Sequence, residues 1–357
     1  MKNLVVLAIL ALLIFGCTLS EHQSEKTNNS IKEPVKKVEE KKDDKLEQIS
    51  DQEVQKEEPK SPRRNVSIYK GFWLPSLDQA SVHSMENRED IVGLGSNTIA
   101  FGLGIPYEKD GKIKEELIPE LKKKTKELIK YYREVGLIVV LAPEPIPSNV
   151  YGEPGPIPEN IREQFLKDYN TVIIELAKIA EEENAEVFSP MNEPDYKLGT
   201  EMSSSWGQQI LPEIKKVFKG KVLWKGALSD KLTDQKNIDF KGYDIIGFTI
   251  FPFGDFDNYD QEVLDVINKI GIWAKEDVIK EIWISEFGNY KYTGIPKEKE
   301  PRSLEIVFEE GKGKVNGFFV FDPPKGFGTQ IKGSYLETVI KEQFEKLNED
   351  IEAVNKN

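Results

Sequence analysis

Short apolar runs alternate with amphipathic helical stretches from residue 65 almost to the C-terminus. This alternation is typical of a parallel sheet whose strands are connected by helices that pack on the sheet. We expect eight strands, which are Ser67–Phe72, Thr98–Leu103, Leu137–Ala142, Glu186–Ser189, Val222–Lys225, Ile245–Ile250, Ile282–Ser285 and Gly317–Phe321. The clearest helices are Glu115–Val135, Glu159–Glu183, Ser203–Phe218, Gln261–Trp273 and Tyr335–Leu347.

Eight strand–helix units in about 290 residues match the size of an α/β fold in which the strands close into a (β/α)8 TIM barrel. The main alternative is a doubly wound open sheet, which normally carries a glycine-rich phosphate turn after its first strand. The segment Gly71-Phe72-Trp73-Leu74-Pro75 is not such a turn. We therefore predict one barrel domain over residues 65–350, followed by a short tail over residues 351–357.

The first 17 residues indicate a targeting segment. Lys2 precedes an apolar run from Leu4 to Phe15, which is too short to span a bilayer comfortably but suits the core of a signal peptide. The run ends in Gly16-Cys17, which resembles the lipobox of secreted lipoproteins, where the cysteine becomes lipidated. The alternative is an uncleaved signal anchor. Both predict attachment to the membrane, with the barrel on the extracellular face.

Residues 18–64 form a second leading segment, rich in Lys, Glu, Asp, Gln and Ser and nearly free of aromatic residues. Such a segment cannot bury enough apolar surface to offset its ordering entropy, so we expect a disordered charged tether. Its positive and negative residues almost balance. The net charge of −13 therefore belongs almost entirely to the predicted barrel.

Composition excludes several kinds of chemistry. The net acidity argues against nucleic-acid binding, which needs a basic face to displace counterions from phosphates. The single cysteine, Cys17, rules out an intramolecular disulfide and any cysteine-based zinc site. His22 and His83 are the only histidines, so a metal site or a Ser-His-Asp triad has few candidates. Carboxylate chemistry without metal or organic cofactor is favoured by elimination.

Chemistry in a barrel of this kind lies at the carboxyl ends of the strands. Glu144, Glu193 and Glu286 follow the third, fourth and seventh expected strands. Aromatic residues also lie at or just past strand ends, and sugars stack their C–H faces on such rings. The candidates for sugar contact are Trp73, Phe251, Tyr290 and Phe321. For any single ring a place in the core is the simpler interpretation.

Two of these carboxylates carry a resemblance to a known clan. Asn192-Glu193-Pro194 after the fourth strand, and Glu286 after the seventh, are similar to the signatures of the GH-A clan of retaining glycoside hydrolases on (β/α)8 barrels. The resemblance implies that Glu193 is the acid/base and Glu286 the nucleophile, with carboxyl groups about 5 Å apart. It also implies that Asn192 binds the 2-hydroxyl of the sugar. Two exposed loop glutamates are the alternative.

The sequence also departs from the clan pattern. Phe251 stands near the end of the sixth strand, where many members have a tyrosine that donates to the nucleophile. Phe321 stands where a tryptophan is common, and no arginine occurs at these strand ends. Glu144 could partly replace a missing polar group. A third option, a metal-dependent lyase, would need a ligand cluster that the sequence does not offer.

Two hypotheses therefore remain. The first is a monomeric retaining endo-β-glycosidase that cleaves an extracellular polysaccharide of the β-mannan, β-glucan or β-galactan type. The second is a catalytically silent barrel that binds glycan as a surface lipoprotein. The segments 143–158 and 251–259 are expected to be long loops that wall an open cleft, since long loops at a barrel mouth usually shape binding.

Overall fold

The computed structural model describes residues 62–75, 83–148, 155–228, 238–252 and 256–355, with side chains as far as residue 348. The chain divides into two units, residues 1–56 and 57–357, and everything described below belongs to the second. Cys17 and nearly all of the expected tether lie outside the described residues. No helix in the described part of the chain is long and apolar enough to cross a bilayer.

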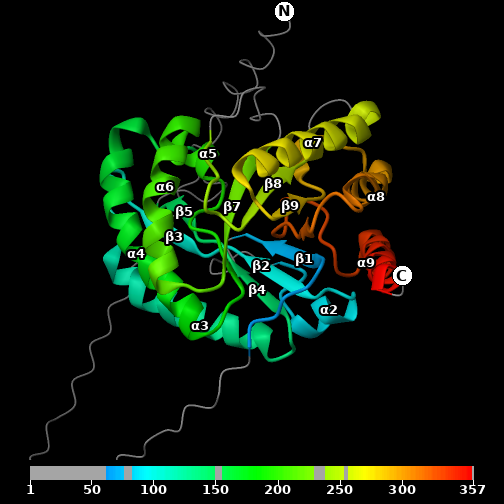
Figure 1. Cartoon of the computed structure of the whole chain (residues 1–357), viewed down its shortest axis with the longest axis horizontal. Helices are drawn as coiled ribbons and strands as arrows, with labels where there is room; N and C mark the ends of the chain where they lie inside the picture. Colours follow the sequence, from blue (N-terminus) through cyan, green and yellow to red (C-terminus); the bar gives the residue numbers. More distant parts are fainter. Residues whose placement is uncertain (1–61, 76–82, 149–154, 229–237, 253–255, 356–357) are drawn as a thin grey trace, which may run out of the picture. The chain divides into compact units, whose positions relative to one another are not determined.

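Eight parallel strands close into a barrel, so the fold predicted from the sequence is confirmed (Figure 1). Each strand pairs with the next along the chain, and the last returns to the first. The strands are β1 (Tyr69–Leu74), β2 (Thr98–Phe101), β4 (Ile138–Leu141), β6 (Val187–Phe188), β7 (Lys221–Leu228), β8 (Ile245–Ile250), β9 (Glu281–Phe287) and β10 (Gly317–Phe321).

Helices surround the barrel, and all five of the expected ones are present (Figure 1). The helices are α2 (Arg88–Gly93), α3 (Ile118–Arg133), α4 (Arg162–Glu182), α5 (Pro194–Leu198), α6 (Thr200–Val217), α7 (Tyr259–Asp277), α8 (Glu300–Gly311) and α9 (Tyr335–Asn355). One 3-10 turn precedes each of α3, α4 and α7, and two precede α8. The last helix continues beyond residue 350, where the sequence predicts a tail.

The strands bury side chains on both faces, which creates two apolar cores. Along β8, Ile246, Phe248 and Ile250 point outward and pack with the helices. Ile245 and Phe251 belong instead to the core inside the barrel. This period of two follows from the alternation of side chains along a strand. It also means that a polar residue in step with Ile245 must lie inside the barrel.

A two-stranded sheet, β3 (Gly104–Tyr107) with β5 (Glu144–Pro147), was not expected. The sequence analysis assigns the proline-rich segment 143–158 to a loop, and this is wrong for its first residues. Pro145 and Pro147 have no N–H to donate to a neighbouring strand. The N–H groups on either side of this pair, those of Glu144 and Ser148, donate to the carbonyls of Leu103 and Tyr107 at 2.8 and 2.9 Å. The prolines thus occupy strand positions that need no donor.

The chain enters the barrel domain at the amino ends of the strands. The Arg63 side chain donates to the carbonyl of Ala185 at 2.7 Å and pairs with Glu181 at 2.5 Å, just before β6. Val66 packs against the core inside the barrel. This end of the barrel, which we call the floor, is therefore covered by the incoming chain.

Candidate active site

Glu193 sits at the carboxyl end of the barrel, five residues after β6 and immediately before α5. Its backbone is left-handed, with φ of 52° and ψ of 55°, which is uncommon for a residue with a Cβ. Two hydrogen bonds fix it there. The Glu193 N–H donates to the Lys225 carbonyl at 3.0 Å, and the Asn192 N–H donates to the Pro143 carbonyl at 2.9 Å. Such strain persists where the surroundings over-determine the conformation, and it concentrates at functional sites.

Glu286 reaches the barrel interior because β9 contains a bulge. On the β8 side, Phe248 pairs with Ile284 but the next residue, Thr249, pairs with Glu286, so Ser285 is an extra residue. The register against β10 shifts in the same place. Trp283 lies inside the barrel, and strict alternation would turn Glu286 outward. The extra residue reverses this, which is a common use of bulges beside active sites.

Lys225 joins the two glutamates. It lies on β7 between them, with its side chain fully buried. Its ammonium donates to Glu193 Oε1 at 2.9 Å, to Glu286 Oε2 at 2.6 Å and to Thr249 Oγ1 at 2.6 Å. An ammonium has three donors, and these contacts engage all of them. The Trp73 ring centroid lies 4.9 Å from the same nitrogen.

These contacts limit the separation of the carboxylates. Glu193 Oε1 and Glu286 Oε2 lie within 2.9 Å of one nitrogen, so they can be no further apart than twice that distance. Retaining glycosidases keep their carboxyl groups about 5–5.5 Å apart, and inverting ones about 6.5–9.5 Å. This pair of oxygens therefore falls below the inverting range. Thr249 closes the cluster by donating to Glu193 Oε1 at 2.7 Å.

The cluster has more carboxylates than ammonium groups, and this separates their pKa values. Burial would raise the pKa of Glu193, but the Lys225 charge and the Thr249 hydrogen bond outweigh it and lower that pKa. Burial raises the pKa of Glu286, Lys225 opposes this and the Glu193 charge adds to it, which leaves a pKa of about 7. Burial and the Glu193 charge also raise the pKa of Asp195 to about 6.

The four aromatic candidates all belong to the core inside the barrel. Phe251, Tyr290 and Phe321 form a triangle, with ring centroids 5.5 to 5.9 Å apart. Each is at most 8% exposed, and Trp73 is 1% exposed beneath Lys225. The exposed ring beside them is that of Tyr292, which packs on Tyr290 at 4.9 Å and is 57% exposed.

Asn192 and Glu144 are also buried at this end. Asn192 is 5% exposed, and among the described residues its side-chain carbonyl oxygen has no hydrogen-bond partner. Glu144 is 6% exposed and pairs at 3.3 Å with Lys197 on α5, which is itself buried. The pair brings no net charge to the site. Glu144 therefore already has an ion-pair partner within the protein.

Comparison with solved structures matches this architecture to polysaccharide hydrolases. A GH113 β-1,4-mannanase gives a TM-score of 0.59 at 17% identity, over 78% of this chain and 99% of that one. The GH113 β-mannanase AaManA of Alicyclobacillus acidocaldarius gives 0.58 at 15%, over 79% and 99%. Thermotoga maritima Cel5A, in complex with mannotriose, gives 0.58 at 16%, over 78% and 97%. The chain has the fold of these glycoside hydrolases. No protein-family model matches its sequence, and no curated protein matches it significantly.

The sequence analysis missed Lys225 and Thr249, although a signal for both was present. Lys225 lies two residues after Leu223, and Thr249 lies two residues before Phe251. Leu223 and Phe251 both face the barrel interior. A charge at an inward position of an apolar strand needs a buried partner, so Lys225 on its own predicted an acidic group inside the barrel.

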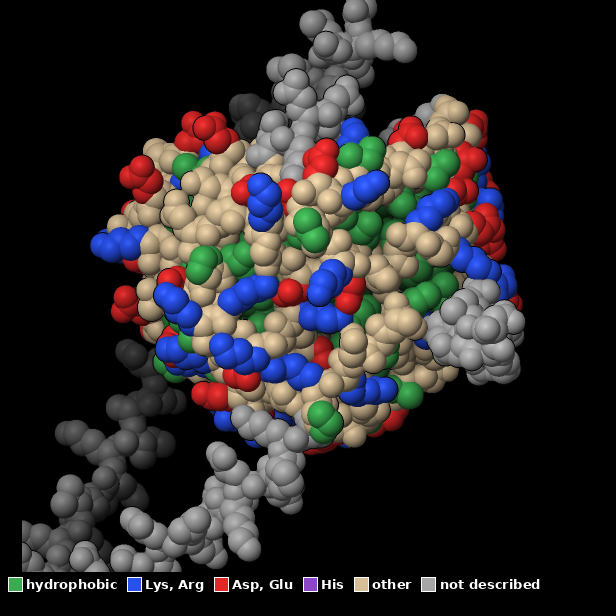
Figure 2. Space-filling view, viewed as in Figure 1, with side chains coloured by type: hydrophobic (Ala, Val, Ile, Leu, Met, Phe, Trp, Pro, Cys, Tyr) green, Lys and Arg blue, Asp and Glu red, His purple; other side chains and the backbone are tan. Residues whose placement is uncertain are grey.

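Other chemistries find little support in the described residues. They contain no group of three or more His, Cys, Asp or Glu side chains placed to hold a metal ion. The two ring nitrogens of His83 each lie 2.7 Å from a backbone carbonyl, those of Asp322 and Pro75, so the ring is not paired with a serine or an acid. On the face seen in Figure 2, Lys and Arg side chains lie across the lower half, with Asp and Glu side chains among them.

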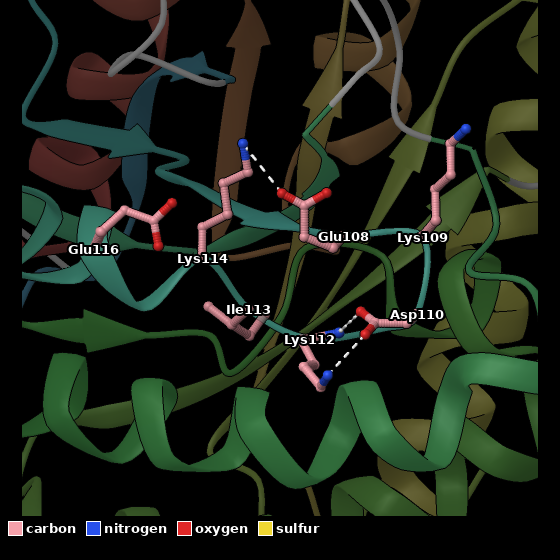
Figure 3. Close-up of a pocket in the computed structure, with 7 residues that line it drawn as sticks. All are labelled: Glu108, Lys109, Asp110, Lys112, Ile113, Lys114 and Glu116. Atoms are coloured by element: carbon pink, nitrogen blue, oxygen red, sulfur yellow. Dashed lines mark hydrogen bonds and ion pairs between the residues drawn. The ribbon is translucent and has the colours of Figure 1, made fainter.

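An open depression after β3 lies apart from the carboxylates (Figure 3). It is lined by Glu108, Lys109, Asp110, Lys112, Ile113, Lys114 and Glu116. Its charges pair with each other, Lys114 with Glu108 at 3.1 Å and Lys112 with Asp110 at 2.9 Å. It shares no residue with the cluster around Lys225, and we assign it no ligand.

Proposed function

We propose that this protein is a retaining endo-β-glycosidase, which hydrolyses O-glycosyl bonds within a β-linked polysaccharide. One observation carries the proposal: Glu193 and Glu286, from two strand ends on different sides of the barrel, meet at a single ammonium group. Two carboxyl groups at this separation, with different proton affinities, are what double displacement at a sugar requires.

In this mechanism Glu286 attacks the anomeric carbon while Glu193 protonates the departing glycosidic oxygen. Glu193 then removes a proton from water, which attacks the glycosyl-enzyme and releases Glu286. The two inversions give net retention. Asn192, with its free buried carbonyl oxygen, is positioned near Glu193 to accept from a sugar hydroxyl. No step needs a metal or an organic cofactor.

The two pKa values differ in the opposite sense to the one that the mechanism needs. Burial raises the pKa of Glu286 to about 7, whereas the Lys225 charge and the Thr249 hydrogen bond outweigh burial at Glu193 and lower its pKa. The mechanism needs Glu286 ionised and Glu193 protonated. The two carboxylates contact the same ammonium, which gives a shared proton a short path between them.

The favoured substrate is a neutral polymer of the β-mannan or β-glucan type, with a β-galactan as a further option. The carboxylates outnumber the ammonium groups at the site, which disfavours polyuronates. The mannanases and Cel5A that share the fold support the same class. We further propose that a monomer acts on the extracellular face of the membrane, attached through Cys17. Cys17→Ser should then release or misprocess it.

The test uses dinitrophenyl β-mannosides and β-glucosides with two variants. Glu286→Ala should lose activity on every substrate, and azide should give an α-glycosyl azide of inverted configuration. Glu193→Ala should keep a rapid first step, because this leaving group needs little protonation, and then stall. Azide should rescue it to a β-glycosyl azide. The opposite pattern would reverse the two roles, and unchanged rates in both variants would end the proposal.

A second candidate is a catalytically silent barrel that binds glycan. It is favoured by the complete engagement of Lys225, which leaves no donor of that ammonium for a sugar. Calorimetry with mannohexaose and cellohexaose separates the two functions. Binding without release of reducing ends over a day would support the silent barrel. Binding with turnover would support the enzyme.

A further inference from the structure

We propose that Lys225 is a positioning residue that decides which of the two site carboxylates holds the shared proton. The inference deepens the proposed glycosidase function and rests on it. It gives Lys225 and Thr249 a role at a site whose strand ends lack the tyrosine and arginine that are common in the clan. Both groups come from neighbouring strands, β7 and β8, that separate the two glutamates.

The first support is the enclosure of the ammonium. Lys225 is fully buried, and its three donors point to Glu193, Glu286 and Thr249. The Trp73 ring stabilises the same charge from a further side. Burial would lower the pKa of Lys225, but the two carboxylates raise it, so the group stays charged. A buried cation whose three donors are all engaged differs from a surface ion pair, because its removal leaves its partners without compensation.

The second support is the count of charges that face it. Glu286 is buried and Glu193 and Asp195 are partly buried, and the Lys225 charge lowers the pKa of all three acids. Asp195 accepts from the Ala227 N–H at 3.0 and 3.2 Å. Glu144 and Lys197 pair with each other, and their charges also act on the site, because Lys197 lowers the pKa of Glu193 and Glu144 raises the pKa of Glu286. One ammonium cannot neutralise both Glu193 and Glu286, so one of them keeps a proton near neutral pH.

The third support is the asymmetry of the contacts. Lys225 lies 2.6 Å from Glu286 Oε2 but 2.9 Å from Glu193 Oε1. Thr249 accepts from Lys225 and donates to Glu193, and its hydroxyl can reverse this second bond when Glu193 is protonated. The proton can therefore pass to Glu193 while the ammonium stays on Glu286. That arrangement is the reactive one.

The experiment compares Lys225→Met and Lys225→Arg with Lys70→Met. Lys70 is also buried on a barrel strand, but its ammonium donates to the Phe344 carbonyl, outside the site. Loss of the ammonium should raise the pKa of both glutamates, because burial remains and its compensation is gone. Both limbs of the kcat/KM profile against pH should move up by about one unit or more in Lys225→Met. Lys225→Arg should restore part of the shift, and Lys70→Met should leave both limbs in place.

A second readout does not depend on activity. With 13C-labelled glutamate, the carboxyl resonances of Glu193 and Glu286, assigned through Glu→Gln variants, report the protonation of each group directly. If the wild-type protein releases no reducing ends, an upward shift of both midpoints in folded Lys225→Met would support the role of Lys225 and remove the proposed glycosidase function. Unchanged midpoints in folded Lys225→Met would overturn the role of Lys225 while leaving the enzyme. Circular dichroism confirms folding, and Lys225→Arg serves if Lys225→Met does not fold.

Discussion

Strand β7 carries one lysine at each end of the barrel, and β9 carries one glutamate at each end. The two lysine–glutamate pairs that result differ in their burial and in the charges around them. At the floor, Lys221 pairs with Glu281 and also donates to Tyr69 and Asn65 at 2.7 and 2.8 Å. At the mouth, four residues further along β7, Lys225 meets Glu286. The glutamates are five residues apart instead of four, because the bulge at Ser285 adds one.

The difference lies in charge balance and burial. At the floor one cation meets one anion, with side chains 29% and 19% exposed, and the remaining partners are neutral. At the mouth Glu193 adds a second anion and the lysine is fully buried. A matched pair can only stabilise the fold, whereas an unmatched one retains a proton at neutral pH. The same two residue types thus form a balanced ion pair at one end and a cluster with an excess of negative charge at the other.

The largest expected effect separates the two glutamates by activity. Glu286→Ala should reduce kcat/KM on a β-mannan or β-glucan by about 10⁴-fold or more, as loss of a nucleophile does. Glu281→Ala, at the floor, should stay within a factor of about three of the wild type at a temperature where both are folded. Release of reducing ends measures both rates. Equal losses would erase the functional distinction between the ends.

The next effect separates the two lysines by stability. Lys225→Met removes the ammonium that both the buried Glu286 and the partly buried Glu193 contact, and it should lower the free energy of unfolding at pH 7.5 by about 3–5 kcal/mol. Lys221→Met breaks a partly exposed pair and should cost about 1 kcal/mol. Urea titration followed by tryptophan fluorescence measures both. If Lys221→Met were less stable than Lys225→Met, the difference in charge balance between the two ends would be contradicted.

The third effect is the dependence of stability on pH. The pKa of Glu286 is raised to about 7 from an ordinary 4.5, so its contribution is fully present below about pH 4.5 and is lost as pH rises through 7. Glu286→Gln should flatten the decline in this window, by about 3 kcal/mol at most. Asp195, with a pKa of about 6, should account for slope that remains between about pH 4 and 6. Urea titrations at half-unit steps of pH test this, with Glu281→Gln expected to keep the wild-type decline.

The smallest effect belongs to Thr249. Thr249→Val keeps the shape but removes a hydroxyl that accepts from Lys225 and donates to Glu193. The loss of one such hydrogen bond should lower kcat/KM about fivefold, equivalent to about 1 kcal/mol. Thr249→Ser should recover most of it. A Thr249→Val variant as inactive as Glu286→Ala would mean that the hydroxyl takes part in the chemistry itself.

The sequence was sufficient for the barrel because each strand carries its own signal. Ile245–Ile250 and Gly317–Phe321 were predicted with the bounds they have, since apolar runs between turn residues have sharp ends. β5 was not predicted, because a proline-rich segment normally indicates a loop. The strand forms because the N–H groups of Glu144 and Ser148 donate to backbone carbonyls, while the prolines lie at positions that need no donor.

The candidate site was predictable in part. Strand order alone indicates that Glu193 and Glu286 lie at the same end of the barrel. The bulge at Ser285 depends on register with β8 and β10, which no local pattern contains, and by alternation Glu286 should have pointed away from Trp283 and the interior. The charge of Lys225 was visible in the sequence, but its three partners come from other strands and are known only once the barrel closes.

The entry of the chain at the floor has a consequence for access. Arg63 is fastened beside β6 at the amino ends of the strands, and Glu193 follows the carboxyl end of the same strand. On the attachment that we propose, the chain that leads to Cys17 leaves the barrel at the end opposite the two carboxylates. A polymer that reaches Glu193 and Glu286 would then approach the domain from the end away from its point of attachment.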